Sequence, residues 1–322
     1  MQNGNHNNPE QPIISVVIPA YNVSTYIGEA LDSVFVQDFK SYEVIVVNDG
    51  STDTTELEKI LEPYGNRIRY IYQENRGISA ARNAALRVAR GELIALLDAD
   101  DSWQTGKLTE QLAFMKEGNF DMVYGDALLI GDVPWPTRTT FMDRSPSNGP
   151  VTLENLLNLR VTVVVSTVIV RRDLLEQCGS FDEADRNLTE DFDLWLRLAH
   201  KGARIGYQRK ILANYRYRSD SISANRMKLH EAALRVLQKT RLGLVLNDSE
   251  KEALDLTAQK LESILILERA KIMIIKGQVA EARAVMAKVR KTSNSWKVSV
   301  SLVLLHTFPG LLSWYLQKRN HS

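Results

Sequence analysis

Four apolar segments alternate with helix-like segments up to residue 98, and this alternation constrains the fold more than any other feature. Residues 13–21 (IISVVIPAY) and 92–98 (ELIALLD) are almost continuously apolar, which is typical of strands buried on both faces. The predicted strands are residues 13–21, 42–50, 67–73 and 92–98, and the predicted helices are residues 25–37, 54–65 (ending at Gly65) and 77–89. We therefore expect an α/β fold with a mostly parallel, twisted sheet and helices on both faces.

The pattern is less regular after Trp103. Residues 131–150 contain four prolines and are interpreted as an excursion or a flexible lid. The other predicted elements are helices at 107–118 and 189–202, strands at 121–130 and 162–170, and one or two strands at 204–218.

The ends of the chain differ from its centre. Residues 1–12 are polar and are predicted to be disordered. A main domain is expected over residues 13–222, with halves 13–103 and 104–222. A helical C-terminal region is expected over residues 223–322. From Arg283 onward there are seven Lys or Arg residues and no Asp or Glu. This region includes the apolar, aromatic-edged tail 296–319, which favours either a membrane surface or a helix docked on the protein's own core.

Composition narrows the class of protein. Apolar and charged fractions of 44% and 25% are those of a soluble globular protein, and a net charge of +1 argues against nucleic-acid binding. The single cysteine, Cys178, excludes an intramolecular disulfide and a cysteine-based zinc cluster. Because no apolar signal segment opens the chain, we expect a cytoplasmic protein.

Three carboxylates, Asp98, Asp100 and Asp101, directly follow the fourth predicted strand. Like charges this close are unfavourable unless a cation or hydrogen-bond donors lie among them. One interpretation is a solvated turn in which Asp101 or Ser102 caps the next helix. The other is a divalent-metal site at the carboxyl end of a parallel strand, where open α/β sheets bind ligands.

Other polar residues follow the first and second predicted strands, in PAYN (19–22) and VNDGSTD (47–53). Because the carboxyl ends of parallel strands share one edge, Tyr21 and Asp49 should lie near the aspartates. An aromatic ring, a carboxylate and a metal site together suit a nucleotide diphosphate, although singly Tyr21 fits a packing role and Asp49 a turn. The first strand is not followed by Gly-x-Gly-x-x-Gly and no P-loop occurs, which argues against those nucleotide-binding motifs.

The motifs PAYN, VNDGSTD, QENRGISAARNAAL and LLDADDSW, followed by TEDFDLWLRLA, resemble in order and spacing a family 2 glycosyltransferase with the GT-A fold. The resemblance covers residues 13–220. It implies inverting transfer of a sugar from a nucleotide donor (UDP-, GDP- or dTDP-linked) to a carbohydrate or lipid-linked acceptor, with Mg²⁺ or Mn²⁺. It also implies a role in bacterial surface polysaccharide or glycolipid synthesis and is compatible with a peripheral location on the inner face of the membrane.

The resemblance assigns the donor site. Tyr21 and Asp49 would hold the base, Pro19 would belong to the nucleotide-sugar site, and Asp98 would approach the ribose. Asp100 would hold the metal, shared with Asp101. Gly77 would permit close approach of the nucleotide, and Arg82 would face it, although on position alone a helix-surface salt bridge explains Arg82 equally well. Arg216 and Arg218 are suited to phosphate, but many relatives have a histidine near the position of Arg218.

Asp191 in TEDFD is the candidate base, because an inverting displacement needs a carboxylate to accept the acceptor's proton. The alternative is an acid that merely stabilises a helix N-terminus. Glu190 and Asp193 are next in line as base. Glu190 and Trp195 are placed on the acceptor side, with Trp195 packing under the site.

No Arg-Trp pair occurs, so the motif of processive polysaccharide synthases is missing and one sugar per encounter is expected. The alternative function is a non-catalytic scaffold that binds sugar nucleotides and acts through its helical tail.

Overall fold

A computed structural model describes residues 11–136, 138–184, 188–218, 225–292, 302, 303 and 307. The chain forms two compact units, Met1–Ala224 and Asn225–Ser322. The predicted disorder of residues 1–10, the predicted boundary at 222–223 and almost all of the tail 296–319 lie outside the described residues.

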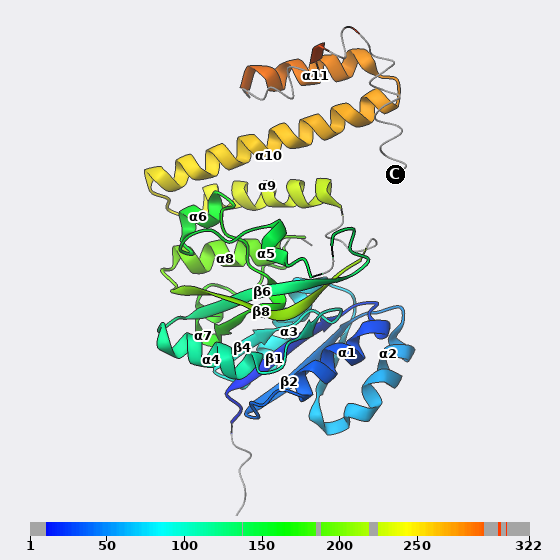
Figure 1. Cartoon of the computed structure of the whole chain (residues 1–322), viewed down its shortest axis with the longest axis vertical. Helices are drawn as coiled ribbons and strands as arrows, with labels where there is room; N and C mark the ends of the chain where they lie inside the picture. The colour runs from blue at the N-terminus through cyan, green and yellow to red at the C-terminus, as the bar shows by residue number, and fades with distance from the viewer. Residues whose placement is uncertain are drawn as a thin grey trace, which may run out of the picture. The chain divides into compact units, whose positions relative to one another are not determined.

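The N-terminal half of the first unit has the predicted alternation of strands and helices (Figure 1). The parallel strands lie in the order β3-β2-β1-β4. Their bounds are β1 Ile14–Ala20, β2 Tyr42–Asp49, β3 Arg69–Gln73 and β4 Leu93–Leu96, and the helices are α1 Ser24–Phe35, α2 Thr54–Leu61 and α3 Ile78–Val88. α2 ends earlier than predicted, because residues Glu62–Arg67 form a 3₁₀ turn (η1) that contains Gly65 at φ 45°.

The second half extends the sheet to eight strands in the order β3-β2-β1-β4-β7-β6-β8-β5. The pairs β4/β7, β7/β6 and β8/β5 are antiparallel, whereas β6 and β8 are parallel. In Figure 1, α8 lies above β6 and β8 and α4 below them, so helices flank the sheet on both sides. The bounds are β5 Ser102–Trp103, β6 Met122–Gly131, β7 Ile169–Arg171, β8 Ile205–Tyr217, α4 Lys107–Glu117, α5 Phe141–Arg144, α6 Leu153–Leu157, α7 Arg172–Gln177 and α8 Glu190–His200.

The predicted strand at 162–170 is mostly wrong. Only its end belongs to β7, and Val165–Thr167 form a 3₁₀ turn, η2. The Thr167 hydroxyl donates to the carbonyl of Val164 at 2.7 Å and accepts the N–H of Gly125 at 3.0 Å. Such side-chain hydrogen bonds offer the backbone an alternative to a strand ladder, so an apolar composition alone does not make this segment a strand.

The central strands place the site. The strands β1, β2 and β4 lie in the buried centre of the sheet, as shown by the full burial of Val16, Ile18, Val46 and Ala95. Burial on both faces accounts for their continuous apolar character. Since the three strands are adjacent and parallel, the polar residues that follow them lie at one sheet edge.

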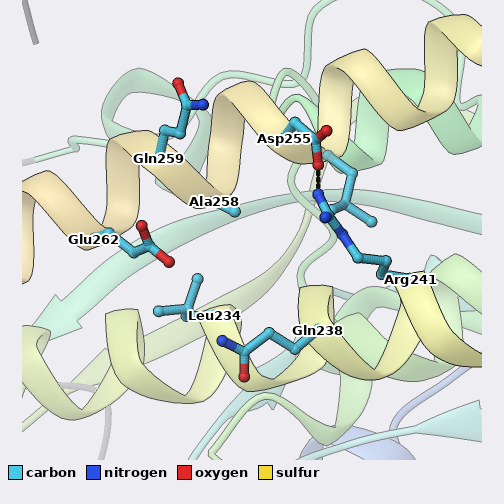
Figure 2. Close-up of a pocket in the computed structure, with 8 residues that line it drawn as sticks. Leu234, Gln238, Arg241, Asp255, Ala258, Gln259 and Glu262 are labelled. Carbon is cyan, nitrogen blue, oxygen red and sulfur yellow. Dashed lines mark ion pairs between the residues drawn. The ribbon is translucent and has the colours of Figure 1, made fainter. Parts of the chain in front are cut away.

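The second unit consists of α9 Arg226–Gly243, α10 Asp248–Ile275 and α11 Val279–Thr292. α10 and α11 form a helix pair around Ala270, Ile274, Ala282 and Met286. A pocket of about 320 Å³ lies between α9 and α10, and an Arg241–Asp255 ion pair crosses it (Figure 2). Among the helices of the described residues, none is both long enough and apolar enough to span a membrane.

Candidate functional site

The loops after β1 and β2 are hydrogen-bonded to each other. Asn22 has a left-handed backbone (φ 54°), its N–H donates to the Ser51 hydroxyl at 3.1 Å, and its side-chain oxygen accepts the N–H of Thr52 at 2.8 Å. Pro19 lies within β1, paired with Val47, whereas Tyr21 is 48% exposed. Tyr21 is therefore not a core packing residue, and its ring is available to a ligand.

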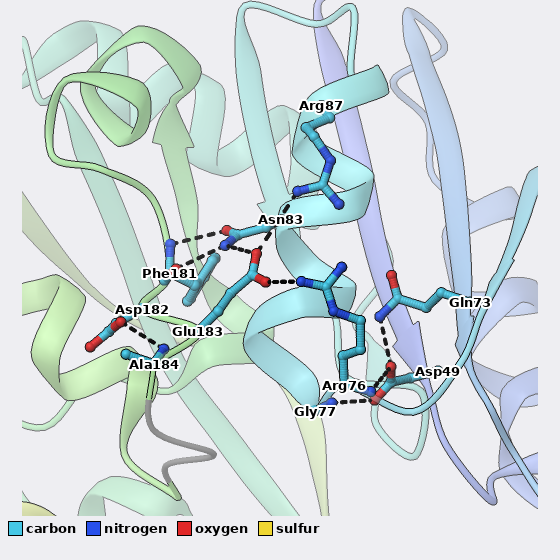
Figure 3. Close-up of polar contacts among 10 residues, drawn as sticks. All are labelled: Asp49, Gln73, Arg76, Gly77, Asn83, Arg87, Phe181, Asp182, Glu183 and Ala184. Carbon is cyan, nitrogen blue, oxygen red and sulfur yellow. Dashed lines mark hydrogen bonds and ion pairs between the residues drawn. The ribbon is translucent and has the colours of Figure 1, made fainter.

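Asp49, the last residue of β2, is almost fully buried and holds the loop that precedes α3 (Figure 3). One carboxylate oxygen accepts Nε2–H of Gln73 at 2.7 Å and the N–H of Arg76 at 2.9 Å, and the other accepts the N–H of Gly77 at 2.8 Å. Gly77 has φ 91°, which a glycine adopts without strain. A carboxylate has about four acceptor positions, so Asp49 retains one for a ligand.

Asp101 is not part of a solvated turn. It is 2% exposed, and its carboxylate accepts the Ser166 hydroxyl at 2.5 Å and the N–H of Arg216 at 2.8 Å. Burial and the nearby charges of Asp100 and Asp98 raise the pKa of Asp101 well above its usual range. The predicted cap is also wrong, because α4 begins after Gly106.

Asp100 faces two arginines, Arg216 in β8 and Arg218 directly after it. Its carboxylate pairs with Arg218 at 3.3 Å, and its carbonyl accepts Nε–H of Arg216 at 2.9 Å. Both guanidinium groups lie 5.0 Å from the ring centroid of Tyr26 on α1. Burial, followed by the charge of Asp98, raises the pKa of Asp100. A ligand cation beside Asp100 would relieve this unfavourable burial of charge.

The donor chemistry fits Mg²⁺ or Mn²⁺, since the candidate ligands are all carboxylate oxygens. Within the described residues, no group of three or more His, Cys, Asp or Glu is arranged to hold a metal ion. Magnesium sites of this kind combine one or two carboxylates with substrate phosphates. Asp100 fits that role better than Asp101, whose oxygens already accept two hydrogen bonds.

Arg82 on α3 is not a surface residue. Its side chain is 1% exposed and forms ion pairs with Asp98 at 2.7 Å and Glu190 at 2.5 Å. Burial alone would lower the pKa of Arg82, but the charges of Asp98 and Glu190 outweigh it and raise the pKa. Arg82 thus joins the end of β4 to the start of α8, and the surface salt-bridge interpretation does not apply.

The three acids in the first turn of α8 have different environments. Glu190 pairs with Arg82, and Asp193 pairs with Arg197 at 2.7 Å. Asp191 is half-buried, and among the described residues its carboxylate accepts one hydrogen bond, from the N–H of Phe192, and forms no ion pair. Burial and the charge of Glu190 raise the pKa of Asp191 to about 7.

Trp195 lies one turn further along α8 and is 2% exposed. Within the described part of the chain, its indole N–H has no hydrogen-bond partner. This burial agrees with a residue that packs under the site.

Sequence reasoning did not identify several residues that organise the site. Ser166 accepts the N–H of Asp98 at 3.1 Å while donating to Asp101. Tyr26 lies against Arg216 and Arg218, and Glu29 accepts a hydrogen bond from Arg216. Asn83, next to Arg82 in the ARN triplet, binds the chain at Phe181. Of these residues, only Asn83 could have been found from the sequence, because it lies within the QENRGISAARNAAL motif.

Comparisons with known proteins identify the family of the chain. Residues 15–179 match the profile described as Glycosyl transferase family 2. The putative teichuronic acid biosynthesis glycosyltransferase TuaG of Bacillus subtilis is 34% identical over 222 residues, which cover 68% of this chain and 84% of TuaG. The UDP-Glc:alpha-D-GlcNAc-diphosphoundecaprenol beta-1,3-glucosyltransferase WfgD of Escherichia coli is 30% identical over 221 residues, or 67% of this chain and 81% of WfgD. The match to an uncharacterized glycosyltransferase of Rickettsia felis, 31% identical over 65% of this chain, spans 35% of that relative.

Solved structures resemble the fold. S. aureus TarS (residues 1–349) in complex with UDP-GlcNAc superposes with a TM-score of 0.60 and 22% identity, covering 84% of this chain and 87% of that TarS fragment. The mannosyltransferase PcManGT from Pyrobaculum calidifontis, in complex with GDP-Man and Mn²⁺, gives a TM-score of 0.59 at 19% identity, over 96% of this chain and 85% of PcManGT. These likenesses confirm the predicted GT-A fold. From the profile match and the extensive match to TuaG, the chain belongs to glycosyl transferase family 2.

Proposed function

We propose that this chain is an inverting, metal-dependent glycosyltransferase that moves one sugar per encounter from a nucleotide diphosphate to an acceptor hydroxyl. The observation that carries this proposal is the state of Asp191. Of the three carboxylates in the first turn of α8, it alone forms no ion pair with an arginine among the described residues, and burial and the charge of Glu190 raise its pKa to about 7. A general base is most effective when its pKa lies near the working pH.

In the proposed reaction, Asp191 accepts the proton of the acceptor hydroxyl as that oxygen attacks the anomeric carbon. The bond between the anomeric carbon and the diphosphate oxygen breaks, and its electron pair leaves with the diphosphate. Attack from the face opposite the leaving group inverts the configuration. General-base assistance contributes roughly a hundred- to ten-thousandfold in rate.

Charge develops on the departing diphosphate, and Arg216 and Arg218 suit its stabilisation. Arg218 lies beside Asp100, and Arg216 is held by the backbone of the aspartate loop (residues 98–101). Asp100, with Asp101 as a second candidate, would hold Mg²⁺ or Mn²⁺, which when bound supplies a fixed positive charge next to the diphosphate. The Mn²⁺ in the PcManGT complex supports this assignment by analogy of fold.

We propose that Tyr21 and the remaining acceptor position of Asp49 hold the base, with Pro19 and Gly77 beside it. Asp98 and Arg82 would then lie on the ribose side. Glu190 and Trp195 are proposed to shape the acceptor side. The names of TuaG and WfgD support a role in bacterial surface polysaccharide or glycolipid synthesis, with a lipid-linked acceptor. We place the catalytic domain at residues 13–222 and the protein at the cytoplasmic face of the membrane.

The test has two stages. A panel of UDP-glucose, UDP-GlcNAc, GDP-mannose and dTDP-glucose is screened for Mn²⁺-dependent thermal stabilisation. Release of the nucleotide diphosphate is then followed with a synthetic GlcNAc-diphosphoundecaprenol acceptor. We expect Asp191→Asn to lower kcat by about a hundredfold or more without changing donor affinity. Asp100→Asn should instead weaken donor binding in the presence of Mn²⁺.

Asp173→Asn is a matched control. Asp173 is the second residue of α7, as Asp191 is of α8, and each carboxylate accepts the N–H of the next residue at 2.8 Å. The control should retain full activity. Transfer by Asp191→Asn at the wild-type rate would overturn the base assignment. Donor binding without turnover by the wild-type protein would instead favour a sugar-nucleotide-binding scaffold.

A further inference from the structure

Two consecutive residues of α3 hold the chain that leads to α8. Arg82 pairs with Glu190, the first residue of α8. Asn83 binds further upstream, where its side-chain amide donates to the carbonyl of Phe181 at 2.8 Å and accepts the N–H of Phe181 at 3.1 Å. This reciprocal pair satisfies both backbone groups of one residue.

The two contacts meet at Phe181. Its side chain is buried, and the guanidinium carbon of Arg82 lies 5.1 Å from the centre of its ring. Asn83 therefore fixes the backbone of the residue whose ring packs against Arg82, and Arg82 in turn holds Glu190 next to Asp191. α3 therefore holds the chain at two points, at Phe181 before α8 and at Glu190, the first residue of α8.

Glu183 extends the contact outward (Figure 3). It accepts a third bond from Asn83 at 2.8 Å and pairs with Arg76 at 2.8 Å and with Arg87 at 3.9 Å. The backbone N–H of Arg76 donates to Asp49. Both arginine side chains are more than half exposed, so these ion pairs contribute little on their own. Asn83 is only 9% exposed, so its hydrogen bonds are better shielded from water than these two ion pairs.

We propose that Asn83 is a positioning residue for the proposed base, which acts through Phe181 and Arg82 to fix Glu190 and Asp191 against the donor site. This inference rests on the proposed function. Misplacing a catalytic group by about 1 Å can cost about a hundredfold in rate, so loss of this contact should act mainly on the chemical step.

The experiment compares Asn83→Ala with wild type, using the donor that wild type accepts from the panel above, the GlcNAc-diphosphoundecaprenol acceptor, and UDP with Mn²⁺ as the binding probe. We expect kcat to fall about 10- to 100-fold, while the Kd for UDP changes less than about threefold.

Tyr64→Phe is the control for a purely structural loss. The Tyr64 hydroxyl donates to Asp32 at 2.8 Å and lies 3.1 Å from the carbonyl of Gly28, within the same unit, and Tyr64 has no part in the site. It should lower the Tm without lowering kcat.

A rescue tests the chemistry of the contact. Asn83→Asp removes the amide donor and sets a second carboxylate against Glu183, so it should be at least as slow as Asn83→Ala. Adding Glu183→Gln restores a donor between the two side chains. The double variant should therefore recover kcat at least threefold over Asn83→Asp but stay below wild type, because the carbonyl of Phe181 still lacks its donor.

Three results would count against the proposal. An active wild type with unchanged kcat in Asn83→Ala overturns the positioning role and leaves the proposed function intact. A parallel loss of kcat and UDP affinity would place Asn83 in the donor site instead. Absence of transfer by the wild-type protein with every donor overturns the proposed function itself, and with it the role of Asn83.

Discussion

At the scale of single residues, three acids of one helical turn show how surroundings determine chemistry. Glu190 and Asp193 are each held by an arginine, whereas burial and the charge of Glu190 raise the pKa of Asp191 to about 7. A carboxyl group with this pKa can take up and release a proton near neutral pH, as a general base must. An ordinary surface aspartate has a much lower pKa and stays ionised at neutral pH.

The pH dependence of the rate follows from this pKa. Asp191 acts as a base only when it is ionised, so kcat/KM should fall about tenfold per pH unit below about pH 7. Glu190→Gln removes a like charge beside Asp191, which lowers the pKa of Asp191 and should shift this acid limb to lower pH. Initial rates at a series of pH values would measure both effects.

Asp173→Asn should leave the acid limb where it is in wild type. A limb that stays in place in Glu190→Gln would mean that another group limits the rate.

The identity of these residues could be predicted from sequence, but their partners could not. Short motifs are enough to propose Asp191, Asp49 and Asp100 as candidates. The ion pair between Arg82 and Glu190 joins residues 108 positions apart, and the burial that raises the pKa of Asp191 arises only in the folded chain. Neither appears in any local pattern.

At the scale of elements, the short turn η2 has more influence on the site than its length indicates. Ser166 donates to Asp101 and accepts the N–H of Asp98, so one hydroxyl fixes both ends of the aspartate loop. The apolar run at 162–170 predicted a strand here, because periodicity cannot register the side-chain bonds of Ser166 and Thr167 that turn the backbone.

Ser166→Ala should be costly for this reason. It leaves a buried carboxylate oxygen and a backbone N–H without their partner, which typically costs about 1–3 kcal/mol for each such group. We expect a lower free energy of unfolding, measured by chemical denaturation, and weaker binding of UDP with Mn²⁺, measured by calorimetry.

Thr167→Ser is the control in the same turn, because it keeps the hydroxyl and removes only a methyl group. An unchanged stability of Ser166→Ala would show that the loop does not depend on this hydroxyl.

At the scale of the whole molecule, the sequence predicted the first half of the main domain better than the second half. The strands β1 to β4 and the helices between them follow from continuous apolar runs and helical spacing, because burial on both faces leaves a clear pattern. The order of β5 to β8 could not be predicted, since β5 has two residues and β8 pairs with strands far away in sequence.

The basic tail gives a prediction for the full chain. Its lysines and arginines should bind vesicles that contain anionic lipid, and binding should weaken as the salt concentration rises. Co-sedimentation of the full chain and of a chain ending at Lys291 would measure this. Equal binding by the two would exclude the tail as the membrane contact.

The pairing of β5 with β8 has a consequence for protein engineering. It sets Arg216 and Arg218 against Asp101 and Asp100, so residues from the two halves of the main domain share one set of hydrogen bonds. A chimaera that joins residues up to 103 of this protein to the remainder of a relative would keep the aspartate loop but replace the strand that secures it. Grafts intended to alter acceptor choice should therefore retain η2, α8 and β8 of the parent.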